Sequence, residues 1–430
     1  MNSRRTRHWA VLFLAMALAL FSMTPSPATG DGALDQPLST GEAGGEREGA
    51  LDLAAEDGVV RQSPDEALAH DLALVAEAKG WTLAEAAADH LAADRIGEVA
   101  EAVARERPDI YVGAALAEEP GGAPRLYVKG PADAYVLDLV AASDIEIVVA
   151  DNQPFSFDEL EARKLRVHRA LEAAGFRYIA TSVNVTGRGV VPAGVTVERG
   201  LPRRVADIVP LLPAGLRGSV QLTVHDQPNV HDEAAFGGMW VRDDGVNECT
   251  SGWSVRNLNT GALGVSTAGH CAGINQINHP GHGVHNLNFQ SQHRGQWGDV
   301  EWHTSPQPEP DDFYADAATI RDVAAVEARG NITVGESVCQ YGRSSNDRDC
   351  SLDVQDVSQA CTNSGVFNNR LVLMNGDTAI GGDSGGGWSF GNTAYGGHKG
   401  NCNPDFPNRD AWSVAALFDE AIGVRVTCGC

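Results

Sequence analysis

All eight cysteines of this 430-residue chain lie after position 248. An even number of cysteines in an exported chain predicts a set of disulfide bonds, which limits the folds open to the C-terminal part. The region before position 248 has no such constraint and must bury an apolar core of its own. A chain of 430 residues is long enough for two or three domains.

Residues 1–30 have the pattern of a secretory signal peptide. Three arginines precede an apolar run over residues 9–23, and small residues at 26–28 offer a cleavage site. The run is shorter than a comfortable membrane span, although an uncleaved anchor is the alternative interpretation. We therefore expect a secreted, extracellular protein with no membrane partner once the signal is removed.

Three segments of different composition follow the signal. Residues 31–64 are rich in Gly, Ala, Asp and Glu, which predicts a flexible acidic leader. Residues 65–200 carry helical stripes up to residue 108 and strand-like runs and a further helix after it, so we expect an α+β module there. The stretch 201–234 contains three prolines and several arginines and is expected to be a linker.

From residue 235 onward, Gly, Asn, Ser and Thr dominate, and short apolar runs alternate with turn residues. A helical stripe remains only at 412–422. This pattern is typical of an all-β sandwich or barrel. The formal net charge of the chain is −25. Because phosphate contacts need clustered Lys and Arg, a nucleic-acid partner is not expected.

Two short strings in this β-rich part carry chemistry. Residues 379–386 read Ala-Ile-Gly-Gly-Asp-Ser-Gly-Gly, and a serine flanked by glycines suits a nucleophile whose turn directs N–H groups at an oxyanion. A serine hydroxyl needs a base, and Ser-Thr-Ala-Gly-His-Cys (266–271) supplies His270 at the end of a strand-like run. A carboxylate should hold the imidazole, and Gly-Asp-Val-Glu-Trp-His offers Asp299.

These strings, in this order, resemble the secreted bacterial serine proteases of the chymotrypsin superfamily, closest to the streptogrisin and α-lytic protease group. Other strings within 235–427 share the resemblance: Ala-Phe-Gly-Gly (235–238), Asn-Glu-Cys-Thr-Ser-Gly-Trp-Ser-Val (247–255), Val-Gly-Glu-Ser-Val-Cys-Gln-Tyr-Gly-Arg-Ser-Ser (334–345) and Gly-Asn-Cys (400–402). The resemblance implies an all-β fold over 235–430, a chymotrypsin-like double antiparallel β-barrel with a C-terminal helix. It also implies protein or peptide substrates, and neither cofactor nor metal.

The resemblance gives five residues of these strings a role. Ser384 is the nucleophile, His270 is the general base and then the acid, and Asp299 orients the imidazole. The N–H groups of Gly382 and Ser384 form the oxyanion hole. Asp383 is expected to pair with a cation under the site. The implied activity is that of a trypsin-like serine endopeptidase.

Asp316 is a second candidate for the carboxylate, because it too stands at a strand-like segment. The spacing from His270 to Asp299 matches the bacterial group, whereas the longer spacing to Asp316 is nearer that of the animal enzymes. The strand-like run 334–340 follows Asp316 too closely for the intervening strands and the domain crossover. Asp299 is therefore favoured.

Residues 65–200 resemble the pro-regions of the α-lytic group in size, in α+β character and in position. The resemblance implies a monomeric enzyme made as a zymogen, whose own pro-region assists folding and inhibits the active site. Activation cleavage near 217–236 would release the mature protease domain (235–430). The alternative is an unrelated stable domain that stays attached.

The resemblance implies two disulfide bonds, Cys249–Cys271 and Cys339–Cys350. Among the other four cysteines Cys361–Cys402 is our assignment, while Cys428–Cys430 or an exchange among the four stays open. The family usually bridges a cysteine before the nucleophile to one near Cys402, but the matching position, near Thr378, holds no cysteine. In the family that bridge frames the specificity pocket, so this sequence departs from the family pattern at the pocket. We expect it to be lined by Thr378, Gly396, Gly397 and His398.

Such a pocket suits apolar or small side chains, whereas His398 would favour acidic ones. Three other interpretations compete with a serine protease. Residues 382–386 also fit the nucleophile elbow of α/β-hydrolases, but that fold needs a late histidine, and only His398 follows. His279, His282 and His285 have a spacing that could suit a metal, although their Gly/Pro/Asn-rich stretch favours a solvated loop. The third is a catalytically silent, protease-like secreted binding protein.

Overall fold

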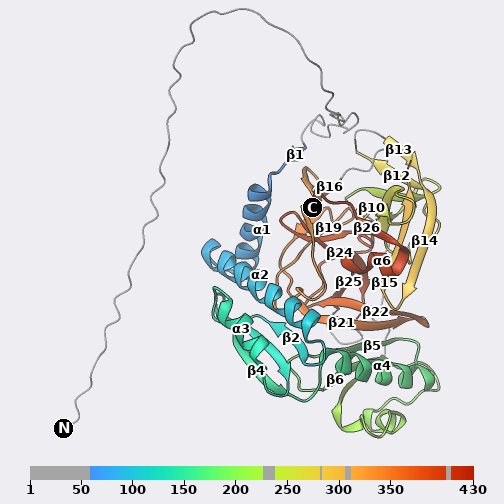
Figure 1. The fold of residues 1–430 in the computed structure, drawn as a ribbon. Helices are drawn as coiled ribbons and strands as arrows, with labels where there is room; N and C mark the ends of the chain where they lie inside the picture. Colours follow the sequence, from blue (N-terminus) through green and yellow to red (C-terminus); the bar gives the residue numbers. More distant parts are fainter. Residues whose placement is uncertain (1–58, 226–237, 281–282, 306–310, 403–407) are drawn as a thin grey trace, which may run out of the picture. The chain divides into compact units, whose positions relative to one another are not determined.

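The computed structural model describes residues 59–225, 238–280, 283–305, 311–402 and 408–430 (Figure 1). The expected signal peptide and most of the expected leader lie outside these ranges. So do residues 226–237, which hold much of the expected activation window. Below, residues 59–225 are called the N-terminal part and residues 238–430 the C-terminal part. Within the described ranges, no helix combines the length and the apolarity needed to cross a membrane.

Two capped helices open the N-terminal part after the short strand β1 (Val60–Arg61). α1 (Pro64–Lys79) and α2 (Leu83–Glu106) each begin with a capping box, in which Ser63 or Thr82 exchanges hydrogen bonds with the glutamate three residues on. Their buried faces share one apolar core with strands of the C-terminal part. Members of that core are Leu72, Val75 and Ala86 from the helices, and Val338, Trp388 and Trp412 from the C-terminal part.

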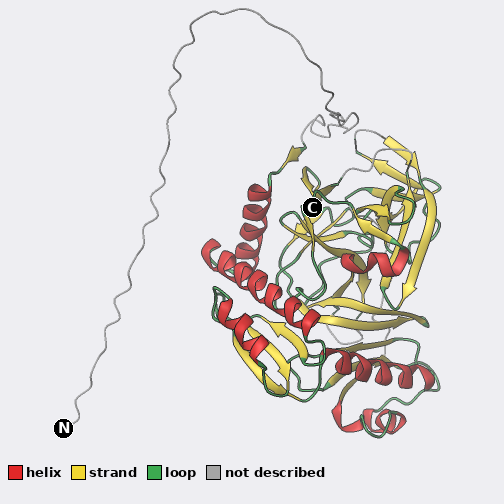
Figure 2. Cartoon of the chain, in the orientation of Figure 1, coloured by secondary structure: helices red, strands yellow, loops and turns green. Residues whose placement is uncertain are grey.

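A small α+β unit follows the helices (Figure 2). Its sheet has the order β2 (Tyr111–Ala115), β3 (Arg125–Lys129), β4 (Val148–Gln153), with an antiparallel first pair and a parallel second pair. The crossover from β3 to β4 carries α3 (Ala134–Ala142), which Asp133 caps. Apolar residues of α2, of the sheet and of α3 form one core, which includes Ile96, Leu126, Val128 and Val136.

The rest of the N-terminal part contains α4 (Phe157–Ala173), β5 (Ile179–Ser182), β6 (Val191–Thr196), α5 (Val205–Ile208), the 3-10 helices η2 (Val209–Leu211) and η3 (Arg217–Ser219), and β7 (Val220–His225). β7 runs parallel to β6 along its whole length. Residues 205–225 are thus part of the fold, where the sequence predicted a linker. The physical reason is burial against α4, because an apolar set from this stretch fills the core there: Ile208, Leu212, Leu216 and Leu222.

Antiparallel strands make up most of the C-terminal part, with a short helix near its end, α6 (Phe418–Ile422), preceded by η4 (Ala415–Leu417). The all-β class expected from the sequence for this part is confirmed. Its strands are β8 (Trp240–Asp243), β9 (Val246–Thr250), β10 (Ser254–Asn257), β11 (Leu263–Thr267), β12 (Gln276–His279), β13 (Gly283–Asn286), β14 (Asn288–Gly295), β15 (Gly298–Thr304), β16 (Asp312–Asp316), β17 (Thr319–Asp322), β18 (Ala325–Val326), β19 (Cys339–Gly342), β20 (Asp347–Asp349), β21 (Val354–Asn363), β22 (Val366–Met374), β23 (Gly387–Phe390), β24 (Thr393–Asn401), β25 (Asp410–Val414) and β26 (Val424–Val426).

These strands form three groups. The smallest is the sheet β1-β17-β16, in which β1 of the N-terminal part runs parallel to β17. Another consists of the sheets β14-β15-β11-β10-β26 and β13-β12-β8-β9, with β26 added from the end of the chain. The third is the sheet β20-β19-β23-β24-β25-β22-β21, which continues through β5, β6 and β7 of the N-terminal part. Thr181 pairs with Ala360 across the junction of β5 and β21. The N-terminal part therefore completes a sheet of the C-terminal part by strand addition.

Candidate active site

Ser384 lies in a tight turn between β22 and β23. The N–H of Asp383 donates to the carbonyl of Ile380 at 2.9 Å, and the N–H of Gly386 donates to the carbonyl of Asp383 at 3.0 Å. Gly385 follows with a φ of +90°, and a Cβ there would overlap the Thr250 carbonyl. Only glycine fits such a position, which explains the residue after the serine.

His270 reaches this serine from the end of β11. Its Nε2 lies 2.8 Å from Ser384 Oγ, and its Nδ1 lies 3.1 Å from Asp299 Oδ2. Asp299 stands at the start of β15, which pairs with β11. The disulfide Cys249–Cys271 ties the residue after His270 to β9. The structure thus brings together the three residues that the sequence singled out.

The Asp299 carboxylate is buried and ionised. Burial alone would raise its pKa, but the charge and hydrogen bond of His270, with the charges of Lys399 and Arg294, outweigh burial and hold the pKa below its usual value. An ionised carboxylate accepts a hydrogen bond from Nδ1–H, so the proton stays on Nδ1 and Nε2 is left to accept the serine proton. The electrostatics therefore fix the imidazole tautomer that a general base requires.

Asp316, the rival carboxylate, lies elsewhere. It ends β16, and its Oδ1 accepts a hydrogen bond from the N–H of Ala318 at 2.8 Å. Its role in the structure is to close the β16–β17 hairpin, since Asp residues commonly accept from the backbone two positions on.

The turn also carries two candidate oxyanion donors. Within the described residues, the N–H groups of Gly382 and Ser384 donate to no other group. Asp383 braces this turn: its Oδ2 accepts from the N–H of Ile380 at 2.9 Å, and its Oδ1 accepts from the N–H groups of Ser344 and Ser345 at 3.0 and 3.1 Å. The sequence led us to expect a cation beside Asp383, and backbone N–H groups take its place.

β24 runs directly beside the serine turn. The N–H of His398 donates to the carbonyl of Gly386, and its own carbonyl accepts from the N–H of Gly385, both at 2.7 Å. The buried His398 ring accepts a hydrogen bond at Nδ1 from Trp388 Nε1–H at 3.3 Å. Gly396 packs against the Trp412 ring, with no room for a Cβ, and Gly397 pairs with Ser413. Of the expected pocket residues, His398 therefore lies next to the site, and Gly396 lies inside the sheet.

Thr378 leads to a residue that the sequence reasoning missed. Its N–H donates to Asp410 Oδ2 at 2.9 Å, and the N–H of Ala379 donates to the same oxygen at 3.2 Å. Burial raises the pKa of Asp410 to about 7, against the opposing charge of His398. Asp410 could not be recognised from the sequence as part of the site. It is a lone aspartate at the start of a strand-like run, and its partners Thr378 and Ala379 lie about thirty residues away.

Four disulfides staple the C-terminal part: Cys249–Cys271, Cys339–Cys350, Cys361–Cys402 and Cys428–Cys430. These are the pairs named from the sequence. Among the described residues, one group has metal-like ligand spacing, Asp71 with Cys339 and Cys350, but both of its sulfurs are in a disulfide. His282 lies outside the described residues, while His279 Nδ1 contacts the Pro280 carbonyl at 2.6 Å.

Ser384 is closed off from solvent in this chain. Its exposed fraction is 0%, and the side chain of His270 is 4% exposed. A nucleophile that attacks a peptide must be reachable by it. The arrangement can therefore move a proton from Ser384 to His270, but it does so here in a covered site.

No family model and no curated protein matches the chain. Solved structures similar to it include Cellulomonas bogoriensis chymotrypsin, with 20% identity and a TM-score of 0.36 over 45% of this chain and 98% of that one. Thermobifida fusca protease A has 21% identity and a TM-score of 0.37 over 46% and 100%. A glutamic acid-specific serine protease, described as using a histidine triad in substrate binding, has 20% identity and a TM-score of 0.36 over 45% and 100%. At values this low, the similarity carries no argument about activity.

Proposed function

We propose that this chain is a secreted serine endopeptidase, made as a zymogen. The observation that carries the proposal is the pair of contacts around His270, at 2.8 Å to Ser384 Oγ and 3.1 Å to Asp299 Oδ2. A serine, an imidazole and a buried carboxylate in this order are the parts of a nucleophile activated by a base. Secretion is inferred from the pattern of residues 1–30 and fits the four disulfides.

In the proposed reaction, Ser384 Oγ attacks the carbonyl carbon of the scissile peptide while His270 Nε2 takes the hydroxyl proton. The N–H groups of Gly382 and Ser384 stabilise the negative charge on the carbonyl oxygen. His270 then gives its proton to the leaving amine, which leaves an acyl group on Ser384. A water molecule then attacks the acyl group in the same way, with His270 as base again. This step releases the carboxylic acid and frees Ser384. Asp299 stabilises the imidazolium without taking its proton.

We also propose that the N-terminal part is the pro-region, and that it extends past the predicted 65–200 to residue 225. Two observations support its assisting role. Strand addition of β5 to β21 orders the β21–β22 pair, which is a common way for one chain to hold another. Lys164 of α4 donates to Ser358 Oγ and Asn369 Oδ1 of that pair, both at 2.8 Å.

Activation would need a cut after β7. The predicted window, 217–236, includes the paired strand at 220–225, where a protease cannot draw the backbone into its own cleft. We therefore place the cut within 226–236. N-terminal sequencing of the secreted form should read a start there.

A peptide-library digest with the processed chain tests the activity. We expect cleavage products that disappear in Ser384→Ala, which keeps the fold and removes the nucleophile. Asp316→Asn is the matched control and should cut at the parent rate, because Asp316 only closes a hairpin.

The alternative function, a protease-like binding protein, is favoured by the full burial of Ser384. It predicts that the processed chain binds peptides of the library without cutting them. Products in the parent and none in Ser384→Ala would exclude it.

A further inference from the structure

A buried carboxylate of the N-terminal part is held by two arginines of the C-terminal part. Asp71 lies on α1, Arg321 on β17 and Arg348 on β20. The exposed fraction is 0% for both Asp71 and Arg321, and 5% for Arg348. An ionised group is buried at such depth only when its charge is matched.

The charge of the Asp71 carboxylate is matched by hydrogen-bond donors of the C-terminal part. Five N–H groups of the C-terminal part donate to Asp71: two from Arg321 at 2.9 and 3.0 Å, two from Arg348 at 2.6 and 2.8 Å, and the backbone N–H of Gly391 at 2.7 Å. Both guanidinium groups bind in the bidentate geometry that selects planar carboxylates. Burial opposes the charge of Asp71, but Arg348 and Arg321 outweigh it and lower the pKa of Asp71 to about 2.

Asp71 is the anion in direct contact with the two arginines, while the charge of Asp316 acts on Arg321 without an ion pair. Among the described residues, the carboxylate of Asp71 is the only one in an ion pair with either guanidinium. Arg321 donates also to Gln62 Oε1 at 2.8 Å and to the Gly391 carbonyl at 3.0 Å, and Arg348 donates to Ser389 Oγ at 3.1 Å. Burial and the nearby charge of Arg348 lower the pKa of Arg321. Without Asp71, two like charges would face each other in a dry site.

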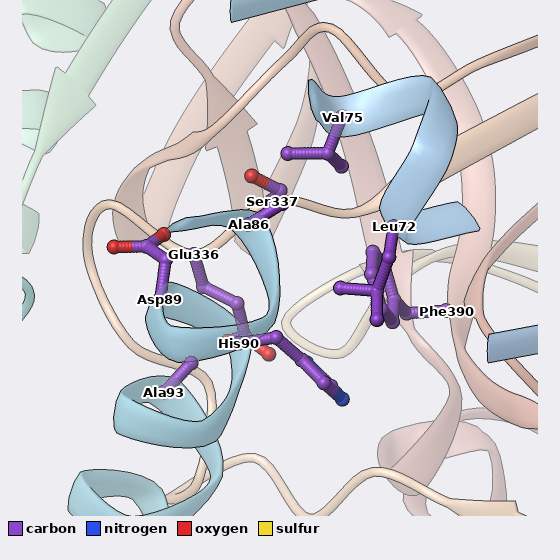
Figure 3. Close-up of a pocket in the computed structure, with 9 residues that line it drawn as sticks. All are labelled: Leu72, Val75, Ala86, Asp89, His90, Ala93, Glu336, Ser337 and Phe390. Atoms are coloured by element: carbon purple, nitrogen blue, oxygen red, sulfur yellow. The ribbon is translucent and has the colours of Figure 1, made fainter. Parts of the chain in front are cut away.

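A small cavity lies beside Leu72, the neighbour of Asp71 on α1. It measures about 10 Å³, enough for one water, and lies between α1, α2 and the C-terminal part, lined by Leu72, Asp89, His90, Glu336 and Phe390 among others. Figure 3 shows the lining side chains of the two helices and of the C-terminal part around this space. None of the three charged groups, Asp71, Arg321 and Arg348, is among the residues that line this cavity.

We propose that Arg321, Arg348 and the N–H of Gly391 form an anion-binding site on the C-terminal part. Asp71 fills this site while the N-terminal part is attached, and a free carboxylate or phosphate fills it once that part has left. The second step rests on the proposed function, because only processing would remove Asp71. The first step does not.

Chemical rescue in the full chain tests the site. The parent carries Ser384→Ala, so that processing cannot intervene, and Asp71→Ala empties the site. We expect Asp71→Ala to lower Tm, and formate to restore most of the loss in a saturable way, with chloride holding the ionic strength constant. Phosphate is the second arm, and the anion with the lower half-effect concentration identifies the better occupant.

Three variants make the result specific. Asp71→Asn fills the site with an uncharged amide, and Asp71→Ala with Arg348→Met lacks a guanidinium, so formate should rescue neither. Asp65→Ala, which removes an exposed acid from the same helix, should need no rescue. If Asp71→Ala does not fold alone, the yield of folded chain in formate replaces Tm as the readout.

Equal gains in Tm for all variants would mean a general salt effect and would overturn the proposal, as would no gain in Asp71→Ala. Because the readout is folding alone, the result does not depend on whether Ser384 reacts. A failure of the proposed function would appear instead as an absence of peptide cleavage.

Discussion

At the scale of single residues, the site depends on a carboxylate that stays charged although it is buried. Asp299 loses its hydration, and it regains the lost free energy from His270, Lys399 and Arg294. The same charge keeps the His270 proton on Nδ1, so that Nε2 faces Ser384 as an acceptor. The negative charge of Asp299 therefore decides which nitrogen of His270 carries the proton. The proposed activity depends on that choice.

Asp299→Asn should remove that charge and keep the shape. An amide can turn its N–H₂ toward Nδ1 and stabilise the wrong tautomer, so we expect kcat to fall by about 10³- to 10⁴-fold. Steady-state kinetics of the processed chain on a cleaved peptide measure the change. Asp316→Asn should stay within twofold of the parent, and an Asp299→Asn enzyme equally close to the parent would contradict the role of Asp299.

At the scale of elements, α4 shows how the two parts are held together. Lys164 is fully buried, and its ammonium reaches across to β21 and β22. Burial lowers the pKa of Lys164 to about 7 despite the nearby Glu161. Such a side chain stabilises the contact between the two parts through buried hydrogen bonds that no water can replace.

Lys164→Met should leave Ser358 and Asn369 without their buried donor. The expected cost is about 1–3 kcal/mol in the free energy of unfolding, because an unsatisfied buried polar group keeps its desolvation penalty. Urea unfolding of the full chain carrying Ser384→Ala measures it. Arg166→Met, an exposed residue on the same helix, should change the free energy by much less.

Some features of the fold and of the candidate site could be predicted from the sequence, and others could not. Ser384 and His270 could be predicted because their neighbours in short strings fix the local geometry. Asp299 could be predicted from its distance along the chain from His270. The folded structure of residues 205–225 and the positions of Asp410 and Asp71 depend on partners far away in the chain. No local period or propensity carries that information, and only the packed fold reveals it.

At the scale of the whole molecule, the boundary between the two parts is rich in buried acids. Burial, together with Glu327 and Asp94, raises the pKa of Glu336 to about 8, although Tyr395 and the Thr333 N–H donate to it. Burial raises the pKa of Asp89 on α2 to about 6. These groups bind a proton more tightly in the folded chain than in the unfolded chain, so they favour folding most at acidic pH.

The free energy of unfolding should therefore fall as the pH rises from about 5 to 8. The unfolded chain loses the Glu336 proton near its ordinary pKa of 4.5, while the folded chain keeps it up to about 8. Urea unfolding at several pH values measures the slope in the full chain carrying Ser384→Ala. Glu336→Gln should flatten it, and Glu77→Gln, at an exposed site, should not. A slope unchanged in Glu336→Gln would contradict this origin.

The N-terminal part contributes a strand, a core face and a counter-ion to the C-terminal part. A C-terminal part made without it would expose the edge of β21 and leave Arg321 and Arg348 unmatched. We expect such a chain to refold in much lower yield than the full chain. Adding residues 59–225 as a separate polypeptide should raise that yield, and equal yields with and without them would show that the assistance is not needed.

The most direct measurement of the central claim is the reaction of Ser384 with a fluorophosphonate probe before and after processing. Mass spectrometry of the digested protein locates the label. We predict one label on Ser384 in the processed chain, little or none in the uncut chain, where this serine is covered, and none in the processed chain with His270→Ala. A processed, folded chain that stays unlabelled at Ser384 would contradict the claim that this site is a serine protease.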